Sequence, residues 1–295
     1  IHGESNIAAS DACEIGSVER GFKEADYVIE DTYKTSRVTH CALENHVCIA
    51  EYDKSGKLTI WSPNQMLYLT RGTLARALDM PIGKIRLIKP LIGGGFGGKA
   101  EPILEPICAV LSKKSGRPVK LEHSPEEEFY AARTRHPSVI YLKAGVKKDG
   151  TLTAIQMKTI YDTGAYASLG PYVMMRAKRA ISLYSHLCHN LKWELYSVYT
   201  NTPVAGAQRG FGNPQSTFAM ETHIDRIAEK LEIDPIELRL KNHIRTGDIN
   251  YDTNYVVDSC ALRDCIVEGA RKIGWENRMR LNETGSKKRR GMGMA

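Results

Sequence analysis

The chain has 295 residues, of which 42% are hydrophobic and 25% charged, an ordinary balance for a soluble globular protein. This length is enough for a large core in one to three domains. The net charge of +7 comes from residues spread along the chain, and the one dense basic run, Lys287–Arg290, has no interleaved aromatics, so we expect no nucleic-acid partner. No apolar run reaches transmembrane length, so we expect no membrane partner either.

The seven cysteines occur without a C-x-x-C motif. This argues against a disulfide framework, a zinc ribbon and plant-type iron–sulfur ligation in this chain. We therefore expect reduced, buried cysteines and a cytoplasmic location. The chain begins with Ile1 rather than Met, which indicates a processed product or a piece of a longer chain.

Residues 1–17 are polar and are interpreted as a tail from a preceding domain, which leaves 18–295 as the domain itself. Alternating apolar and β-branched residues then predict three strands. These strands are 27–35, 47–52 and 58–62. His40 and His46 flank Glu44, but the three residues fall on no fixed helix, so a protein-bound metal there is only an alternative.

The densest glycine cluster, Gly93 to Lys99, lies between a predicted strand at 85–88 and a predicted helix at 103–114. Glycine lacks a Cβ and tolerates positive φ, so such a loop lets the backbone approach an anion or a cofactor closely. It partly fits two nucleotide-binding patterns, G-x-G-x-x-G and G-x-x-x-x-G-K, but Ala100 stands where the second needs Ser or Thr. A nucleotide cradle and a simple packing turn both stay open as alternatives.

The rest of the chain mixes strands and helices. A hairpin with its turn at Asp149 and Gly150 joins two predicted strands, and a further strand leads to a second glycine-rich turn at 209–212. The first predicted helix covers 66–80. Further strands are predicted at 119–123, 138–147, 152–161 and 192–200. Of the later helices, one begins at 124, one ends at 231, one begins at 235 and one covers 260–273. Without regular βαβ alternation, this pattern predicts an α+β fold with mixed sheets and packed helices.

Two motifs together carry a family resemblance. Gly-Gly-Gly-Phe-Gly-Gly-Lys at 93–99 and Arg-Gly-Phe-Gly-x-Pro-Gln at 209–215 resemble the molybdenum hydroxylases, the xanthine dehydrogenase and aldehyde oxidase family. Gln65 falls where that family places a glutamine beside the metal. The resemblance covers nearly the whole chain and implies the first half of a molybdopterin-binding domain.

The resemblance implies site residues as well. Molybdenum would be held by the pterin dithiolene, so that no side chain ligates the metal directly. The implied catalytic residues are Gln65 and Arg209. The implied cofactor-binding residues are Gln65, Gly95, Phe96, Gly97, Arg209 and Gly210. The implied substrate residues are Phe211, which would stack on an aromatic ring, Ala100, where purine hydroxylases have glutamate, and Arg176, beside the position of their substrate-clamping arginine.

The family reaction inserts water-derived oxygen into an electron-poor carbon with the help of a base glutamate, and electrons leave through iron–sulfur centres to flavin. Family members continue past the point where this chain ends. Either this chain is a fragment, or the molybdenum domain is divided between two subunits. The divided arrangement implies a second molybdopterin-domain subunit that carries the glutamate, and the family also has an iron–sulfur subunit and a FAD subunit. A chain active only in such a complex resembles the divided clostridial nicotinate dehydrogenases.

That resemblance implies an N-heteroaromatic carboxylate such as nicotinate as the substrate. A purine or aldehyde substrate of the same family stays an alternative, although the loss of the purine-specific glutamate at Ala100 disfavours xanthine. The pterin is expected to carry cytosine dinucleotide if the source is bacterial, and either sulfur or selenium could be a molybdenum ligand. A non-catalytic assembly module is the remaining hypothesis.

Overall fold

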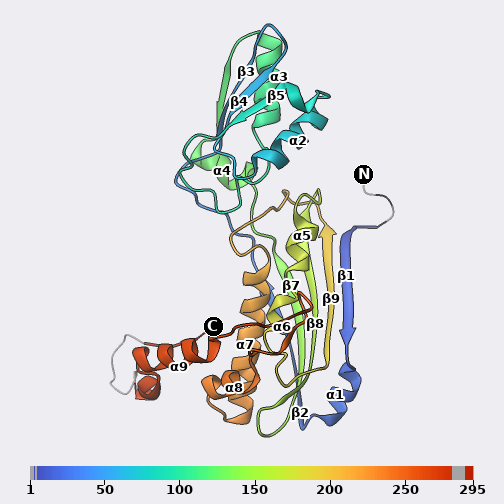
Figure 1. The fold of residues 1–295 in the computed structure, drawn as a ribbon, viewed down its shortest axis with the longest axis vertical. Coiled ribbons are helices and arrows are strands. Elements are labelled where there is room, and N and C mark those ends of the chain that lie inside the picture. Colours follow the sequence, from blue (N-terminus) through green and yellow to red (C-terminus); the bar gives the residue numbers. More distant parts are fainter. Residues whose placement is uncertain (1–2, 4, 281–289, 295) are drawn as a thin grey trace.

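Two lobes are stacked along the long axis of the molecule, each built on its own sheet (Figure 1). In this computed structural model, the described residues are 3, 5–280 and 290–294, so most of the basic run at 287–290 lies outside them. The upper lobe contains a four-stranded sheet and the lower lobe a five-stranded sheet. The α+β class with mixed sheets that the sequence predicts is confirmed.

The upper sheet has the strand order β5–β4–β3–β6, in which only β4 and β5 run parallel. Its elements are β3 (Val47–Tyr52), β4 (Leu58–Trp61), η1 (Ile82–Lys84), β5 (Ile85–Ile88), β6 (Val119–Glu122), α2 (Leu67–Ala77), α3 (Glu105–Ser115) and α4 (Pro125–Ala131). Alternate strand residues such as Ala50, Leu58 and Ile60 are fully buried with Cys108 of α3. The period-2 alternation of the strands therefore supplies one apolar face, which α3 covers.

The lower sheet has the order β1–β9–β8–β7–β2, with β8 and β9 parallel. Its elements are β1 (Ile7–Ile15), α1 (Val18–Glu24), β2 (Tyr27–Thr35), β7 (Ser138–Val146), β8 (Leu152–Gly164), α5 (Gly170–Met175), α6 (Arg179–Ser182), β9 (Leu191–Tyr199), α7 (Asn213–Leu231) and α8 (Pro235–Asn242). A parallel pair needs a crossover, which α5 and α6 provide. Helices α5 to α7 bury their apolar residues on one face of the sheet (Figure 1).

The expectation of a polar tail is wrong for residues 7–15. These residues form β1, which pairs antiparallel with β9 from Ile7 opposite Val198 to Ile15 opposite Leu191. An edge strand needs only one hydrogen-bonding neighbour and can expose half of its side chains, which allows Ser10, Asp11 and Glu14 in this strand. Its partner lies far away in the sequence, so no local pattern reveals it. The division of the chain into domains stays a prediction.

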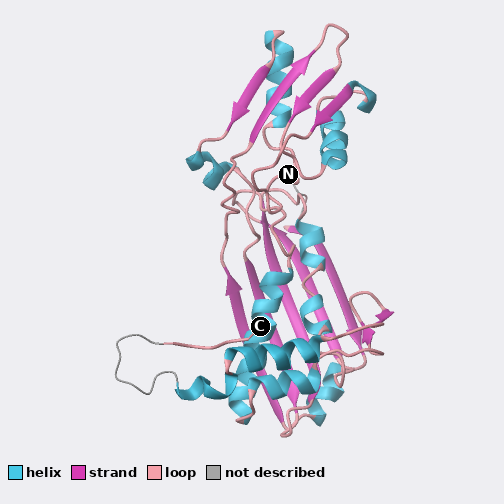
Figure 2. Ribbon diagram, turned by 60° about the vertical axis from the view of Figure 1, so that its left-hand side comes forward, coloured by secondary structure: helices cyan, strands magenta, loops and turns pink. Residues whose placement is uncertain are grey.

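Loops gather between the two sheets (Figure 2). They are the segments 36–46, 89–104, 132–137 and 200–212, which contain no helix and only the isolated bridge between Val38 and Arg135. Beyond α8 the chain adds β10 (Ile249–Asn250), β11 (Tyr255–Val256), α9 (Leu262–Ile273) and η2 (Trp275–Arg280). The fold thus brings the two glycine-rich turns to the junction of the lobes.

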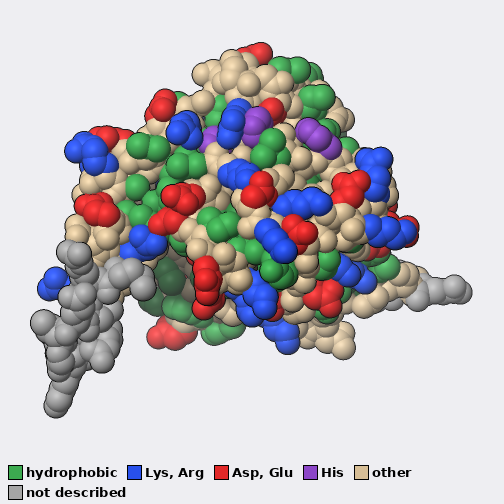
Figure 3. Space-filling view, turned by 90° about the horizontal axis from the view of Figure 1, so that it is seen from below, with side chains coloured by type: hydrophobic (Ala, Val, Ile, Leu, Met, Phe, Trp, Pro, Cys, Tyr) green, Lys and Arg blue, Asp and Glu red, His purple; other side chains and the backbone are tan. Residues whose placement is uncertain are grey.

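The structure shows which cysteines are buried and how the charged side chains are distributed on one face. All seven cysteines are free, but Cys13, Cys41 and Cys265 are exposed, so the expectation of general burial is wrong. On the face seen from below, Lys and Arg are interspersed with Asp and Glu (Figure 3). In the described part of the chain, every helix is too short or too polar to cross a bilayer.

Candidate functional site

The two glycine-rich loops contact each other directly at the junction of the lobes. The backbone N–H of Arg209 donates to the carbonyl of Phe96 at 2.8 Å. The Arg209 carbonyl in turn accepts from the Arg135 guanidinium at 2.8 Å. Two motifs that are separated by more than a third of the chain are therefore in direct contact, and the binding site that the resemblance implies for them stays a prediction.

Gln65 holds the first loop in place. It lies just before α2, and its own N–H donates to the Lys99 carbonyl at 2.7 Å. Its side-chain Oε1 accepts from the N–H of Gly97 at 2.9 Å and from the N–H of Lys99 at 3.2 Å. Among the described residues, none accepts from Gln65 Nε2, and the side chain is exposed. The amide thus has one end fixed on the loop and one donor end available to a ligand.

Both loops place a phenylalanine in the left-handed region of backbone space, Phe96 at φ 51° and Phe211 at φ 50°. Such a conformation costs about 1–3 kcal/mol for a non-glycine residue and is maintained only when the surroundings enforce it. The neighbours Gly97 and Gly210 also have positive φ, 100° and 91°. A run of this kind turns successive N–H groups toward one side, a geometry that suits an anionic ligand.

His40 connects the loops at the junction through hydrogen bonds of its imidazole ring, a role that the sequence did not reveal. Its Nε2 lies 2.7 Å from the carbonyl of Ala207 and its Nδ1 lies 3.1 Å from the carbonyl of Arg133. A Cβ on Gly98 would lie 3.0 Å from the imidazole ring. Burial lowers the pKa of His40, whereas its bonds to the two carbonyls act in the opposite direction. The imidazole is therefore a packing and hydrogen-bonding link between three loops.

The residues predicted to contact substrate have different surroundings. Ala100 is only 3% exposed, and its N–H donates to the Gly97 carbonyl at 3.1 Å. Arg176 is exposed at the end of α5, while its neighbour Ala177 is part of the lower core. Phe211 is half-buried and packs on that core. Phe96, predicted as a cofactor contact, is the more accessible aromatic ring at 46% exposed.

Lys99 does not face the surface of the loop. It is 3% exposed, and its Nζ donates to the carbonyl of Glu44 at 2.8 Å and forms an ion pair with the Glu44 carboxylate. Helix α3 begins only at Glu105, so its N-terminus is not part of the loop. A phosphate-binding loop needs both an accessible lysine and a helix start, so the geometry disfavours the nucleotide cradle.

The surface at the junction fits an anionic cofactor. Among the described residues, none accepts a hydrogen bond from the backbone N–H of Phe96 or of Gly210, and both residues are exposed. Gly95 is buried below the Gln65 side chain, where a Cβ would lie 2.6 Å from Gln65 Oε1. Two backbone N–H donors and one amide donor without an acceptor among the described residues, and one accessible aromatic ring, therefore lie on these two contacting loops and on Gln65.

Comparison with protein families gives a direct match. Residues 1–243 match the family described as molybdopterin cofactor-binding domain. The xanthine dehydrogenase molybdenum-binding subunit of Escherichia coli O157:H7 is 37% identical over the whole chain and 39% of its own length. The nicotinate dehydrogenase large molybdopterin subunit of Eubacterium barkeri is 39% identical over 84% of this chain and 58% of its own length.

Solved structures show the same fold. An aldehyde oxidoreductase from Desulfovibrio gigas superposes with a TM-score of 0.90 at 29% identity, covering 97% of this chain and 31% of its own. Quinoline 2-oxidoreductase from Pseudomonas putida 86 gives 0.85 at 26% identity, covering 94% of this chain and 36% of its own. The chain thus spans less than two thirds of the length of each of these relatives.

Proposed function

This chain belongs to the molybdenum hydroxylase family through its molybdopterin cofactor-binding domain, and from that premise we propose that it forms the first half of the cofactor site of a hydroxylase. The observation that carries the proposal is the contact between the two glycine-rich loops, with Arg209 N–H donating to Phe96 and Gln65 fixed on the same loop. When bound, the molybdenum–pterin group supplies the redox centre at which an electron-poor carbon acquires water-derived oxygen.

In this proposal the chain binds and orients the cofactor. The N–H groups of Phe96 and Gly210 would donate to anionic groups of the cofactor, and Gln65 Nε2 would donate to a ligand of the molybdenum. Gly97 lets the two loops approach each other, since a Cβ there would lie 2.6 Å from the Ala207 carbonyl oxygen. No side chain of this chain is required as a direct metal ligand, because the dithiolene fulfils that role.

The proposed substrate is an N-heteroaromatic carboxylate such as nicotinate. Two relatives, a nicotinate dehydrogenase and a quinoline oxidoreductase, carry the names of N-heteroaromatic compounds. Phe211 would stack on the ring and Arg176, exposed on the lower lobe, would attract the carboxylate. Since other relatives are named for xanthine and aldehydes, purines and aldehydes are the alternatives within the family.

The proposed assembly contains further chains. A second molybdopterin-domain subunit supplies the base glutamate, and separate subunits supply iron–sulfur centres and FAD. The cofactor is proposed to carry cytosine dinucleotide, with sulfur or selenium as a molybdenum ligand, and the complex is proposed to work in the cytoplasm. The name of the Eubacterium barkeri relative, a large molybdopterin subunit, supports a divided arrangement.

The test is a substrate panel on the purified native assembly in ¹⁸O-labelled water. We expect reduction of an electron acceptor with nicotinate and a hydroxylated product that contains ¹⁸O. Turnover of xanthine or of an aldehyde with the same label would move the assignment to another substrate of the family. A product that takes its oxygen from O₂ would contradict the proposed reaction.

A further inference from the structure

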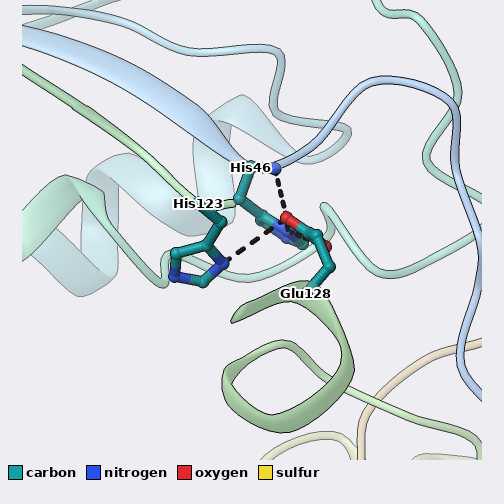
Figure 4. Close-up of side chains that lie close together, drawn as sticks. All are labelled: His46, His123 and Glu128. Atoms are coloured by element: carbon teal, nitrogen blue, oxygen red, sulfur yellow. Dashed lines mark hydrogen bonds and ion pairs between the residues drawn. The ribbon is translucent and has the colours of Figure 1, made fainter. Parts of the chain in front are cut away.

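Two histidines and a glutamate meet beside the first glycine-rich loop (Figure 4). His46 immediately precedes β3 and His123 immediately follows β6, and these strands pair antiparallel with Val47 opposite Glu122. The N–H of His123 donates to the His46 carbonyl at 2.9 Å, which extends the pairing by one residue and brings the two side chains together. Glu128 reaches the same point from α4.

The start of α4 fixes the direction of the glutamate. Ser124 caps this helix, and its side chain and that of Glu127 exchange hydrogen bonds with each other's backbone N–H. This reciprocal cap sets the position of the first turn. Glu128 then turns back toward β3, and its carboxylate also accepts from the backbone N–H of His46. The three side chains come from rigid, separately anchored segments.

The distances suit a shared cation. His46 Nδ1 lies 2.9 Å from each carboxylate oxygen of Glu128, and His123 Nδ1 lies 3.4 Å from Oε1. All three ligand atoms lie within 4.8 Å of one another, the one such group of three among the residues that the structure describes. A tetrahedral zinc site with Zn–N of about 2.0 Å has ligand–ligand distances of about 3.3 Å. Only a small rearrangement would therefore be needed.

The second nitrogen of His46 sets its tautomer. Nε2 lies 3.1 Å from the carbonyl oxygen of Gly98, which can only accept, so Nε2 carries the hydrogen. In the neutral imidazole Nδ1 then presents its lone pair toward Glu128. Donation of the remote N–H to a backbone carbonyl is the usual way in which proteins orient a metal-binding histidine.

His123 supplies the independent observation. Its side chain is more than nine-tenths buried, and among the described residues Nδ1 has no hydrogen-bond partner, although it points toward the Glu128 carboxylate. Buried polar atoms are nearly always satisfied. An ion pair between His46 and Glu128 alone leaves this nitrogen 3.4 Å from Oε1 without a hydrogen bond, whereas a cation between the three groups uses its lone pair.

We propose that His46 Nδ1, His123 Nδ1 and Glu128 form a binding site for a divalent transition-metal ion of the zinc class. Three protein ligands leave a fourth position for water, which can enter beside the Glu128 side chain, 17% exposed. The ion fixes the ring of His46, whose Nε2 donates to the Gly98 carbonyl, and so it stabilises the loop that precedes Lys99. The proposal does not depend on molybdenum binding.

The test uses the full chain in its native assembly. The protein is treated with a chelator and equilibrated with Zn²⁺, and bound zinc is measured by mass spectrometry and compared with the His123→Gln and Glu128→Gln variants. We expect one zinc per chain, bound at least about tenfold more weakly in either variant, because losing a ligand costs at least as much as losing an outer-shell partner. A matched control is His186→Gln, since His186 Nδ1 faces Asp248 at 2.9 Å without a third ligand among the described residues.

The control variant is expected to bind zinc like the unaltered protein. Absence of bound zinc in the folded unaltered protein, or equal affinity in the His123→Gln variant, would overturn the proposal. If the variants fail to fold, X-ray absorption at the zinc edge of the unaltered protein identifies the ligand atoms and so tests the proposal. Two imidazole nitrogens with oxygen ligands support the site, and a sulfur shell contradicts it.

Discussion

Gly97 lies at the contact between the first glycine-rich loop and the segment that leads into the second. It has a φ of 100°, and a Cβ would lie 2.6 Å from the carbonyl oxygen of Ala207. The Gly97→Ala variant combines backbone strain with this overlap, so we expect a loss of about 1–3 kcal/mol in the free energy of unfolding. We also expect the molybdenum content to fall at least tenfold, measured by mass spectrometry alongside thermal unfolding.

The matched control is Gly83→Ala. A Cβ at Gly83 meets nothing within 4 Å, and its φ lies outside the left-handed region. This variant should retain both stability and molybdenum. Equal molybdenum in the Gly97→Ala variant and the unaltered protein would show that the two loops do not hold the cofactor together.

Gln65 gives a second prediction at this scale. In Gln65→Glu the carboxylate still accepts from Gly97 and Lys99, but the donor Nε2 is lost. Removing a single positioned donor typically lowers kcat by about a hundredfold, so we expect that loss per molybdenum at an unchanged melting temperature. Gln156→Glu, opposite Lys143 and Lys192 on the lower sheet, is the control and should retain activity.

The candidate site could be predicted only in part from the residues. Phe96 and Arg209 belong to the two motifs, and Gln65 follows from its position before the first motif. The structure places the three close together, although their roles stay predictions. The sequence suggests His40 as part of a metal site, but it cannot reveal the partners of this side chain, which are backbone carbonyls of distant loops. His123 was not considered, since only the pairing of β3 with β6 brings it to His46.

At the scale of elements, the packing of α7 on β2 gives a pH-dependent prediction. His223 of α7 is fully buried, with Nδ1 3.0 Å from the hydroxyl of Tyr33. Burial lowers the pKa of His223 from 6.5 to about 4. Between these values the unfolded chain binds a proton that the folded chain does not, so stability decreases as the pH falls, by about 1.4 kcal/mol per pH unit.

The measurement is the free energy of unfolding of the unaltered protein and of the His223→Gln variant from pH 7 to pH 4. Glutamine keeps a polar partner for Tyr33 but does not titrate, so its curve should lack this contribution below pH 6.5. Parallel curves for the two proteins over the whole range would show that His223 is not held neutral.

Elements with strong local signals were predicted well. The strands at 27–35 and 47–52 have the bounds that their alternation predicts, and the turn at Asp149 and Gly150 joins β7 to β8. The short helices α5 and α6 were not predicted, because segments of six and four residues give no helical periodicity. They form through packing on the lower sheet, which depends on residues elsewhere in the chain.

At the scale of the whole molecule, the chain covers 39% of its Escherichia coli O157:H7 relative and 58% of its Eubacterium barkeri relative. The proposed function takes the base glutamate from another chain or from a segment that is not part of this sequence, so we expect this chain on its own to be inactive. Turnover should appear only when the second molybdopterin subunit is added, measured as acceptor reduction with nicotinate. Turnover by the isolated chain would contradict this division of the site.

The most direct test of the central claim is the molybdenum content of the purified native assembly, measured together with the identity of its chains. If the two glycine-rich loops hold a molybdopterin cofactor, the assembly should contain close to one molybdenum per copy of this chain, and the Gly97→Ala variant should lose it. Fully assembled and folded protein that contains no molybdenum would contradict the account.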